Sequence, residues 1–320
     1  KNKLISIDFP VIPKFDQLKS KITQRGPSAF LTIQEGCDKF CSFCVVPYTR
    51  GSEYSRSIYS IIDEAKKLID AGVKEITLLG QNVNAWSSKG KDGKVWRLGS
   101  LIKELAKINE LQFIRYTTSH PLDMDLELIE AHRDIEKLMP YLHLPLQSGS
   151  DNILKLMNRK HKVDDYLKII EKVRNYIPNI AISGDFIIGF PGETDKDHDA
   201  TIKIIKEVKF SQAYSFKYSV RPGTPAAVFF NQVDEQIKSS RLQEVQNILR
   251  EQQFEFNKKS INSVIKVLIL KNGKKVNQYL GRSPQNQSVY FNHEKENLIG
   301  SIINVKVSEA FQNSISGSIV

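Results

Sequence analysis

The stretch "EGCDKFCSFCVVPYTRGSEYSR", residues 35–56, contains every cysteine of this 320-residue chain. Cys37, Cys41 and Cys44 form a C-x3-C-x2-C array directly after the first strand-like run, so we expect them on a loop at the end of a strand. Cysteines that only fill a core would be scattered along the chain. Three clustered cysteines also argue against a disulfide framework and indicate a reducing compartment.

Three thiolates on a tight loop suit a [4Fe–4S] cluster, which normally takes four cysteines. A missing fourth cysteine leaves one iron open to an exogenous ligand. The alternatives are a structural zinc ion, for which His143 or His120 is available as fourth ligand, and a catalytic thiol, which needs only one cysteine and a nearby base. The pattern favours the cluster and leaves zinc as the main alternative.

The composition, with 40% hydrophobic and 26% charged residues, is typical of a soluble globular protein. No apolar run approaches the ~18 residues of a membrane span, and no signal peptide is present, so we expect a cytoplasmic protein without a membrane partner. The net charge of +10 suits a polyanionic partner such as nucleic acid, or simply a solvated basic surface.

Residues 1–27 are typical of a linker, so we expect a preceding N-terminal part to be missing.

Strand-like apolar runs alternate with helix-period segments from residue 28 onward. The alternation predicts a parallel sheet with right-handed crossovers. Six strands are too few for an eight-fold barrel, so we predict an open, partial (β/α)6 barrel over residues 28–253, with a doubly wound sheet as the alternative. In both, ligands bind at the carboxyl ends of the strands. The predicted strands are residues 28–34, 73–80, 111–118, 141–147, 179–190 and 212–219.

The pattern changes period after a predicted helix over residues 235–259. Short strands separated by turns then predict a small all-β barrel over residues 254–320. This segment has nine Lys and Arg against four Asp and Glu, so it carries +5 of the total charge of +10. A small basic barrel commonly binds nucleic acid, although a structural cap is the alternative.

The cysteine array after the first strand of such a partial barrel resembles the radical S-adenosylmethionine (SAM) superfamily. Three further stretches, "VVPYTRGSEYSRS" (45–57), "GQNVNAW" (80–86) and "SFKYSVRPGTPAA" (215–227), are similar to its methylthiotransferase branch. The stretch "YLGRSPQNQSVYF" (279–291) resembles part of the TRAM domain, an RNA-binding module. The resemblance covers nearly the whole chain.

This resemblance implies that SAM chelates the open iron of a cluster held by Cys37, Cys41 and Cys44. The reduced cluster then splits SAM into methionine and a 5′-deoxyadenosyl radical. Without the resemblance, the polar strand ends are ordinary turns, and Ser150 is a good N-cap for a helix that begins at Asp151. The residues that the resemblance places at SAM are Gly80, Gln81, Asn82, Gln147, Ser148, Gly149, Ser150, Arg159, Gly189 and Gly192.

The similarity is greatest to the branch that adds a methylthio group to C2 of N6-isopentenyladenosine next to the anticodon. Threonylcarbamoyl-adenosine and a ribosomal protein are alternative substrates, and a non-catalytic, zinc-containing RNA-binding protein is the rival from another class. The implied partners are a tRNA anticodon loop and an electron donor such as flavodoxin or ferredoxin, with the chain a monomer. Full-length members carry an N-terminal domain with three further cysteines and a second [4Fe–4S] cluster. We therefore expect this chain to be incomplete for sulfur insertion.

Overall fold

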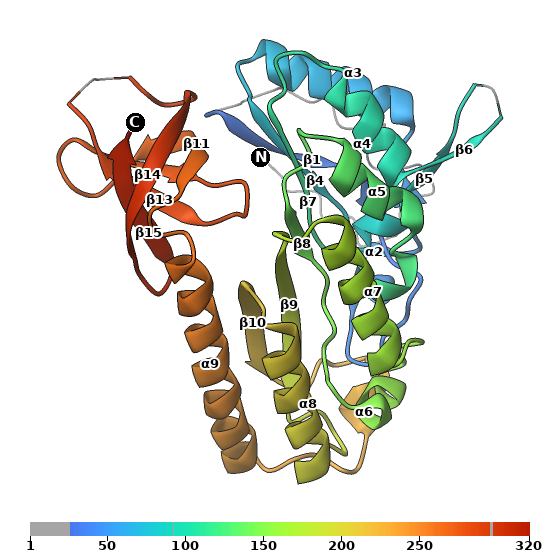
Figure 1. Cartoon of the computed structure of the whole chain (residues 1–320). Coiled ribbons are helices and arrows are strands. Elements are labelled where there is room, and N and C mark those ends of the chain that lie inside the picture. Colours follow the sequence, from blue (N-terminus) through green and yellow to red (C-terminus); the bar gives the residue numbers. More distant parts are fainter. Residues whose placement is uncertain (1–25, 92, 295–296) are drawn as a thin grey trace, which may run out of the picture.

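The larger part of the molecule is an incomplete barrel of parallel strands (Figure 1). The computed structural model describes residues 26–91, 93–294 and 297–320. Two ladders, β1-β4-β7 and β8-β9-β10, are joined by a bridge between Ile114 and Leu138. No ladder among these residues joins β10 to β1, so the barrel is open. The strands are β1 (Ser28–Thr32), β4 (Glu75–Leu79), β7 (Phe113–Tyr116), β8 (Tyr141–His143), β9 (Ala181–Ile188) and β10 (Gln212–Lys217).

The sequential strand order confirms the predicted parallel arrangement and excludes a doubly wound sheet, whose order reverses. The helices between the strands lie along the outer face of the sheet (Figure 1). They are α3 (Ile58–Asp70), α4 (Leu98–Ala106), α5 (Leu126–Asp134), α7 (Val163–Tyr176) and α8 (Asp195–Val208).

Helix α3 shows why these segments are helical. Ser57 caps its first turn by accepting a hydrogen bond from the Tyr59 N–H. The helix buries one face against the sheet, with Ile61 and Ala65 fully enclosed. Gly72 follows the C-cap at φ +95°, where glycine is favoured because it has no Cβ. A capping serine, an apolar face and a closing glycine thus account for the start, the packing and the end of this helix.

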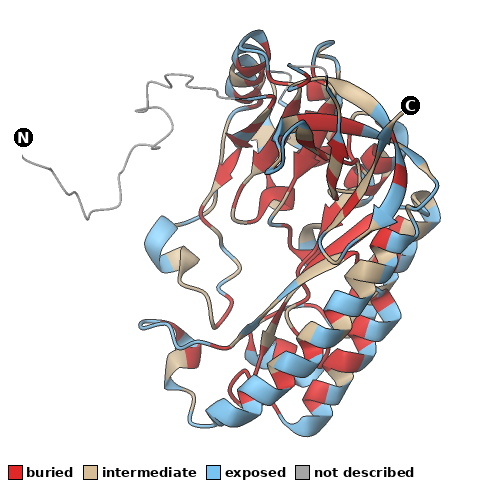
Figure 2. Cartoon of the chain, turned by 90° about the vertical axis from the view of Figure 1, so that its left-hand side faces the viewer, coloured by how far each residue is buried: buried red, intermediate tan, exposed pale blue. Residues whose placement is uncertain are grey.

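Alternation along the strands separates an outer, helix-facing core from the inner face of the barrel. In β9, Ile182, Phe186 and Ile188 belong to the main hydrophobic core. Asp185 and Ile187, which point to the other face, are only partly buried. Figure 2 shows the same division, with buried residues along the strands and exposed residues on the outer sides of the helices.

Several short elements lie at the carboxyl ends of the strands. Helix α6 (Asp151–Leu156) begins after Ser150, as predicted from that N-cap. The sequence did not predict the others, because each is too short to show a period. They are α2 (Val46–Arg50), the ladder of β2 (Gln34–Glu35) with β3 (Tyr54–Ser55), the hairpin of β5 (Ser87–Lys89) with β6 (Val95–Arg97), and the 3-10 turns η1 (Val83–Ala85), η2 (Pro121–Asp123) and η3 (Pro225–Val228).

Helix α9 (Glu235–Lys258) leads into a closed five-stranded barrel of order β11-β12-β13-β15-β14, called the small barrel below. All five strands were predicted, and they enclose a hydrophobic core of their own. The predicted domain boundary at residue 254 falls inside α9, and this division stays a prediction. Residues 1–25 of the predicted linker lie outside the described residues. The strands are β11 (Val264–Asn272), β12 (Gln278–Arg282), β13 (Ser288–Asn292), β14 (Ile302–Ala310) and β15 (Ser314–Ile319).

The contact between the loop after β8 and α8 leaves no room for a side chain at Gly149. A Cβ there would lie 2.5 Å from Thr201 Cα and 2.7 Å from the Ala200 carbonyl oxygen. Because both are backbone atoms of a helix, we expect Gly149→Ala to destabilise the fold by about 2 kcal/mol, seen as a lower melting temperature. The exposed Asn152→Ala is the matched control. An unchanged melting temperature for Gly149→Ala would contradict this packing.

Candidate functional site

The cysteine loop begins at a position that only glycine can occupy. Gly36 has φ +75°, and a Cβ on it would lie 2.1 Å from the Ser52 carbonyl oxygen. The loop then turns back on itself, with the Cys37 N–H donating to the Gly51 carbonyl (3.3 Å) and the Cys44 N–H to the Cys41 carbonyl (3.0 Å). Backbone hydrogen bonds therefore help to fix the loop, and the Val46 N–H also donates to Cys44 Sγ at 3.5 Å.

The thiols are close enough to affect one another. Burial raises the pKa of Cys37 to about 11, and Cys41 and Cys44 are among the neighbours that raise it further. Burial also raises the pKa of Cys44, with Cys41 again adding to it. Deprotonating all three would crowd negative charge in a partly buried loop. A group that binds them must therefore bring positive charge, as iron or zinc does.

Arg159 supplies one such charge. Its Nη1 lies 3.8 Å from Cys41 Sγ, and its Nη2 donates to the Pro145 carbonyl at 2.7 Å. Its side chain is buried, and its Nε has no partner among the described residues. The same segment holds the loop in place, because Asn158 donates to the Phe40 carbonyl and Ser42 to the Leu156 carbonyl.

The turn after β4 is bonded directly to the cysteine loop through the buried side chain of Gln34. Gln34 Nε2 donates to the Gly36 carbonyl at 2.8 Å, while its Oε1 accepts from the backbone N–H groups of Gln81 (2.8 Å) and Asn82 (3.1 Å). Gln81 Oε1 accepts from the Gly36 N–H at 2.8 Å. A Cβ on Gly80 would lie 2.5 Å from Gln34 Oε1. The structure thus brings the predicted Gly80, Gln81 and Asn82 to the cysteines.

Sequence reasoning missed Gln34, because a lone glutamine at a strand end has no distinguishing signal. It also missed the link between Lys39 and Asp123, which are 2.7 Å apart. Asp123 accepts a hydrogen bond from Asn82 Nδ2 at 2.8 Å. The other side-chain atom of Asn82, the acceptor Oδ1, is buried and has no partner among the described residues. A ligand amino group would satisfy it.

The histidines named as possible zinc ligands lie elsewhere. His143 is on the inner face of the barrel, 3.1 Å from Ser183 Oγ and 3.5 Å from Asp185 Oδ2. His120 packs edge-on against His161, and its Nδ1 accepts from the Leu122 N–H at 3.2 Å. Burial, with Arg159 and His161 nearby, lowers the pKa of His120 to about 2.

No three or more His, Cys, Asp and Glu side chains in the described ranges are grouped as ligands of one metal ion. The three cysteines lie beside the cationic Arg159, and the turn after β4 brings the unpartnered acceptor Asn82 Oδ1 to the same loop. This set of donors would suit a [4Fe–4S] cluster with an amino-group ligand.

The predicted residues after β8 have structural partners. The Ser150 hydroxyl caps α6, accepting from the Ile153 N–H at 3.4 Å, and donates to Asp197. The Gly149 N–H donates to Thr201 Oγ1 at 3.0 Å, and the Ser148 hydroxyl accepts from the Ser150 N–H at 3.2 Å. Gln147 is at the strand end with φ +78° and stays partly exposed.

The glycine turn after β9 is packed against α9. Gly189 has φ +70°, and a Cβ there would lie 2.3 Å from Lys238 Cγ. Its N–H donates to Glu193 Oε1 at 3.0 Å, and Arg241 of α9 pairs with the same oxygen at 2.9 Å. The Gly192 N–H donates to the Asn231 carbonyl at 2.7 Å. These contacts account for the glycines structurally, and their predicted contact with SAM stays a prediction.

Comparison with known proteins places this site in a family. The model of the radical SAM superfamily matches residues 31–205. The tRNA-2-methylthio-N(6)-dimethylallyladenosine synthase of Bartonella bacilliformis is 55% identical over 319 residues, covering 98% of this chain and 69% of that protein. The chain belongs to the radical SAM family of tRNA-2-methylthio-N(6)-dimethylallyladenosine synthases. The Bartonella tribocorum synthase is 56% identical over the same share of the chain.

Solved radical SAM enzymes share the fold of this synthase family member. HemN, the coproporphyrinogen III oxidase of Escherichia coli, has a TM-score of 0.52 at 15% identity, covering 81% of this chain and 67% of its own. The methyltransferase TsrM of Kitasatospora setae, with cobalamin and a [4Fe–4S] cluster bound, has a TM-score of 0.52 at 16% identity, covering 63% and 39%. The predicted family and the radical SAM α/β fold are therefore confirmed. Membership implies a [4Fe–4S] cluster and SAM.

No helix among the described residues has the length and apolar character needed to cross a membrane.

We predict that replacing Cys37, Cys41 or Cys44 singly with alanine removes the cluster, because each thiol would bind a different iron. Iron and sulfide analysis and the visible absorbance of the anaerobically reconstituted protein measure this. Thr49→Ala, exposed just beyond the cysteines, should keep the full cluster. Stoichiometric zinc in the wild type, lost on any one substitution, would contradict the cluster.

Proposed function

We propose that this chain performs the radical SAM chemistry of a tRNA methylthiotransferase, adding a methylthio group to C2 of N6-dimethylallyladenosine next to the anticodon. The observation that carries the proposal is the 55% identity over 98% of the chain to a synthase named for this product. It supports this substrate over threonylcarbamoyl-adenosine, over a ribosomal protein and over a non-catalytic zinc protein.

In this proposal Cys37, Cys41 and Cys44 hold the [4Fe–4S] cluster and leave one iron open. When bound and reduced, the cluster with SAM supplies a 5′-deoxyadenosyl radical that removes a hydrogen atom from the substrate. Asn82 Oδ1, which has no partner among the described residues, would accept a hydrogen bond from the SAM amino group. Arg159 would offset the negative charge of the thiolates, and its unpartnered Nε would be a donor for an anionic group of the cofactor.

The remaining predicted residues would line the SAM site from neighbouring strand ends. Gln81 holds the β4 turn to the cysteine loop, and Gln147 offers a partly exposed amide after β8. The turns at Ser148–Ser150 and Gly189–Gly192 would provide backbone surfaces, with their own side-chain groups used in packing and capping.

The inner face of the barrel offers a surface for a purine. Phe30, Tyr214 and Phe216 are 72%, 47% and 57% exposed. Phe30 pairs with Thr77, which faces inward, while Tyr214 and Phe216 pair with Asp185 and Ile187. Exposed aromatic rings at the two open edges suit stacking with a base that has been turned out of an RNA loop. Their apolar surface also suits the dimethylallyl group.

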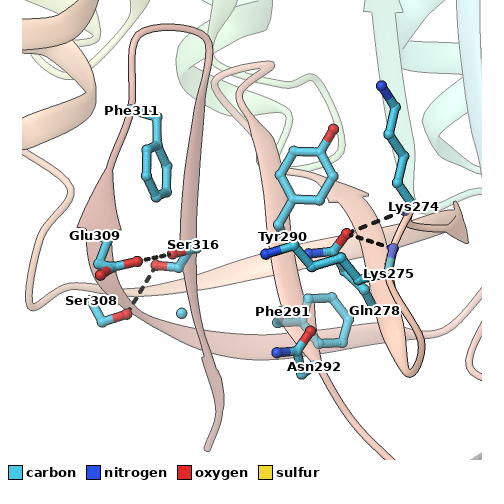
Figure 3. Close-up of a pocket in the computed structure, with 11 residues that line it drawn as sticks. Lys274, Lys275, Gln278, Tyr290, Phe291, Asn292, Ser308, Glu309, Phe311 and Ser316 are labelled. Atoms are coloured by element: carbon cyan, nitrogen blue, oxygen red, sulfur yellow. Dashed lines mark hydrogen bonds between the residues drawn. The ribbon is translucent and has the colours of Figure 1, made fainter.

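The small barrel is proposed to be a TRAM domain that contacts RNA backbone and bases. Figure 3 shows the residues that line a surface hollow, with Tyr290 next to the turn of Lys274 and Lys275 and Phe311 on the opposite side. Gln278 Oε1 shapes that turn by accepting from the backbone N–H groups of Lys274 (3.2 Å) and Lys275 (3.4 Å). Aromatic rings beside exposed lysines are typical of single-stranded nucleic-acid sites.

We further propose a cytoplasmic monomer that receives electrons from a flavodoxin or ferredoxin. The basic net charge of +10 would favour association with both an acidic redox protein and RNA.

The proposed reaction is tested by reconstituting the chain anaerobically with iron and sulfide, reducing it and adding SAM with tRNA that carries N6-dimethylallyladenosine. We expect 5′-deoxyadenosine, formed faster with this tRNA than without it and measured by mass spectrometry. Unmodified tRNA is the matched control. No 5′-deoxyadenosine from the iron-loaded protein, or methylthiolation of threonylcarbamoyl-adenosine instead, would contradict the proposal.

Replacing both Lys274 and Lys275 with alanine should weaken tRNA binding about tenfold and reduce its salt dependence by about two counterions, since each lysine neutralises one phosphate. SAM cleavage should not change, because the turn lies outside the cysteine site. Lys168→Ala/Lys172→Ala on the outer face of α7 removes the same charge and should leave binding unchanged. Equal binding by both double variants would defeat the assignment.

A further inference from the structure

A buried ionic network connects the small barrel to the open barrel of parallel strands β1, β4, β7, β8, β9 and β10, called the half-barrel below. This contact between the two barrels is called the joint. Glu75, the first residue of β4, is fully buried. Its Oε2 accepts from Arg115 Nε at 2.7 Å, and its Oε1 from Arg282 Nη1 at 2.6 Å and from Ser28 Oγ at 2.9 Å. Burial alone raises the pKa of Glu75, but Arg115 and Arg282 outweigh it and hold the pKa below its ordinary value. The carboxylate is therefore charged and depends on both arginines.

Arg115 also holds the backbone of the turn between β12 and β13. Its Nη1 donates to the Pro284 carbonyl at 2.9 Å and its Nη2 to the Ser283 carbonyl at 2.8 Å. The alternation of β7 places Arg115 on the inner face, opposite the core residue Ile114. The turn of the small barrel thus lies against the inner face of the half-barrel, at the end where the strands begin.

Two further contacts fix the same joint. Phe113 and Met139 of the half-barrel share a hydrophobic cluster with Leu268 of β11. Gln287, at the end of the turn, donates to Asn257 Oδ1 of α9 at 3.0 Å. Asn257 in turn donates to the Phe311 carbonyl at 2.9 Å, next to the proposed RNA-binding hollow.

The joint and the cysteine site are at opposite ends of the half-barrel. Glu75 begins β4, whereas the cysteine loop follows the end of β1, which runs parallel to β4. Figure 1 shows α9 running along this length, from the turn after β10 up to the small barrel. Its 24 residues span about 36 Å at 1.5 Å per residue. The lower end of α9 is tied beneath the Gly189 turn by the Arg241–Glu193 pair.

We propose that the Glu75–Arg115–Arg282 network is a positioning device, which locks the small barrel as a second RNA anchor at a fixed distance from the cysteine site. The inference rests on the proposed tRNA function. A barrel that swung freely on α9 would separate Arg282 from the Glu75 carboxylate and the Ser283 and Pro284 carbonyls from the Arg115 guanidinium. Losing one charged partner of a buried carboxylate and two acceptors of a buried guanidinium is unfavourable. RNA bound at the small barrel would therefore lie at one fixed distance, about the length of α9, from the carboxyl ends of the half-barrel strands where the cysteine loop lies.

The first test is structural and needs no RNA. Arg282→Met removes the one network side chain that is partly exposed, 32% in its side chain, and keeps much of its volume. We expect hydrogen exchange of the Ser283, Asn286 and Gln287 amides, which are hydrogen-bonded within this turn, to speed up about tenfold, with SAM cleavage unchanged. Arg250→Met, on the exposed side of α9, removes the same charge as a control. Unchanged exchange in Arg282→Met would overturn the proposal.

The second test is functional. Arg282→Met should raise the KM for tRNA about fivefold while leaving the rate of RNA-independent SAM cleavage unchanged, because the anchor is displaced but the cysteine site is not. In the Arg282→Met background, replacing Lys274 and Lys275 should have little additional effect on tRNA binding. If the losses of tRNA affinity caused by Arg282→Met and by the two lysine replacements simply multiply in the combined variant, the proposal is overturned. Lys274 and Lys275 would then bind RNA equally well without the Glu75–Arg115–Arg282 network.

A third measurement covers the case in which Arg282→Met does not fold. Calorimetry of the unmodified chain should give one unfolding transition for both barrels, and two well-separated transitions would overturn the locked joint. If the wild type shows slow exchange of the Ser283, Asn286 and Gln287 amides and one unfolding transition but no tRNA-dependent 5′-deoxyadenosine, the proposed function fails while the positioning proposal stands. If it forms tRNA-dependent 5′-deoxyadenosine although the amides exchange rapidly, the positioning proposal fails while the proposed function stands.

Discussion

Three thiols in one short, partly buried loop are the constraint around which the molecule is organised. Cys41 and Cys44 raise the pKa of Cys37, and Cys41 raises the pKa of Cys44, so ionised thiols in this loop call for bound positive charge. Arg159, the Gln34 bridge and the Lys39–Asp123 pair hold the loop from three different segments of the barrel. These contacts between protein groups position the loop, as a cofactor of fixed shape requires.

Helix α9 also connects the cysteine site to the surface of the small barrel at the other end of the molecule. Helix α9 is tied at one end to the turn after β9 and at the other to the small barrel through Asn257 and Gln287. The Glu75 carboxylate then fixes the small barrel against the first strands of the sheet. In our proposal, this arrangement holds the cysteine site at one end and the RNA contact at the other at a fixed distance.

The sequence predicted what depends on local pattern. The six parallel strands, the strands of the small barrel and the α6 N-cap all follow from periodicity and capping residues. The cysteine array was found because its spacing is distinctive, whereas the Gly80–Asn82 turn was predicted only from the family resemblance. Gln34 and the Glu75–Arg282 pair were not, since the latter joins residues 207 positions apart and neither shows any local signal. Gly149 and Gly189 were interpreted as cofactor contacts, whereas helix packing already explains why they must be glycine.

The central claim is that Cys37, Cys41 and Cys44 bind a cluster with one iron open to SAM. Electron paramagnetic resonance of the reduced, reconstituted protein tests it most directly, recorded with and without SAM labelled with nitrogen-15 at its amino group. We predict four irons per chain, a spectrum that changes on adding SAM, and coupling between the label and the cluster. A zinc-loaded protein without a cluster signal, or a cluster whose spectrum SAM does not alter, would contradict the account.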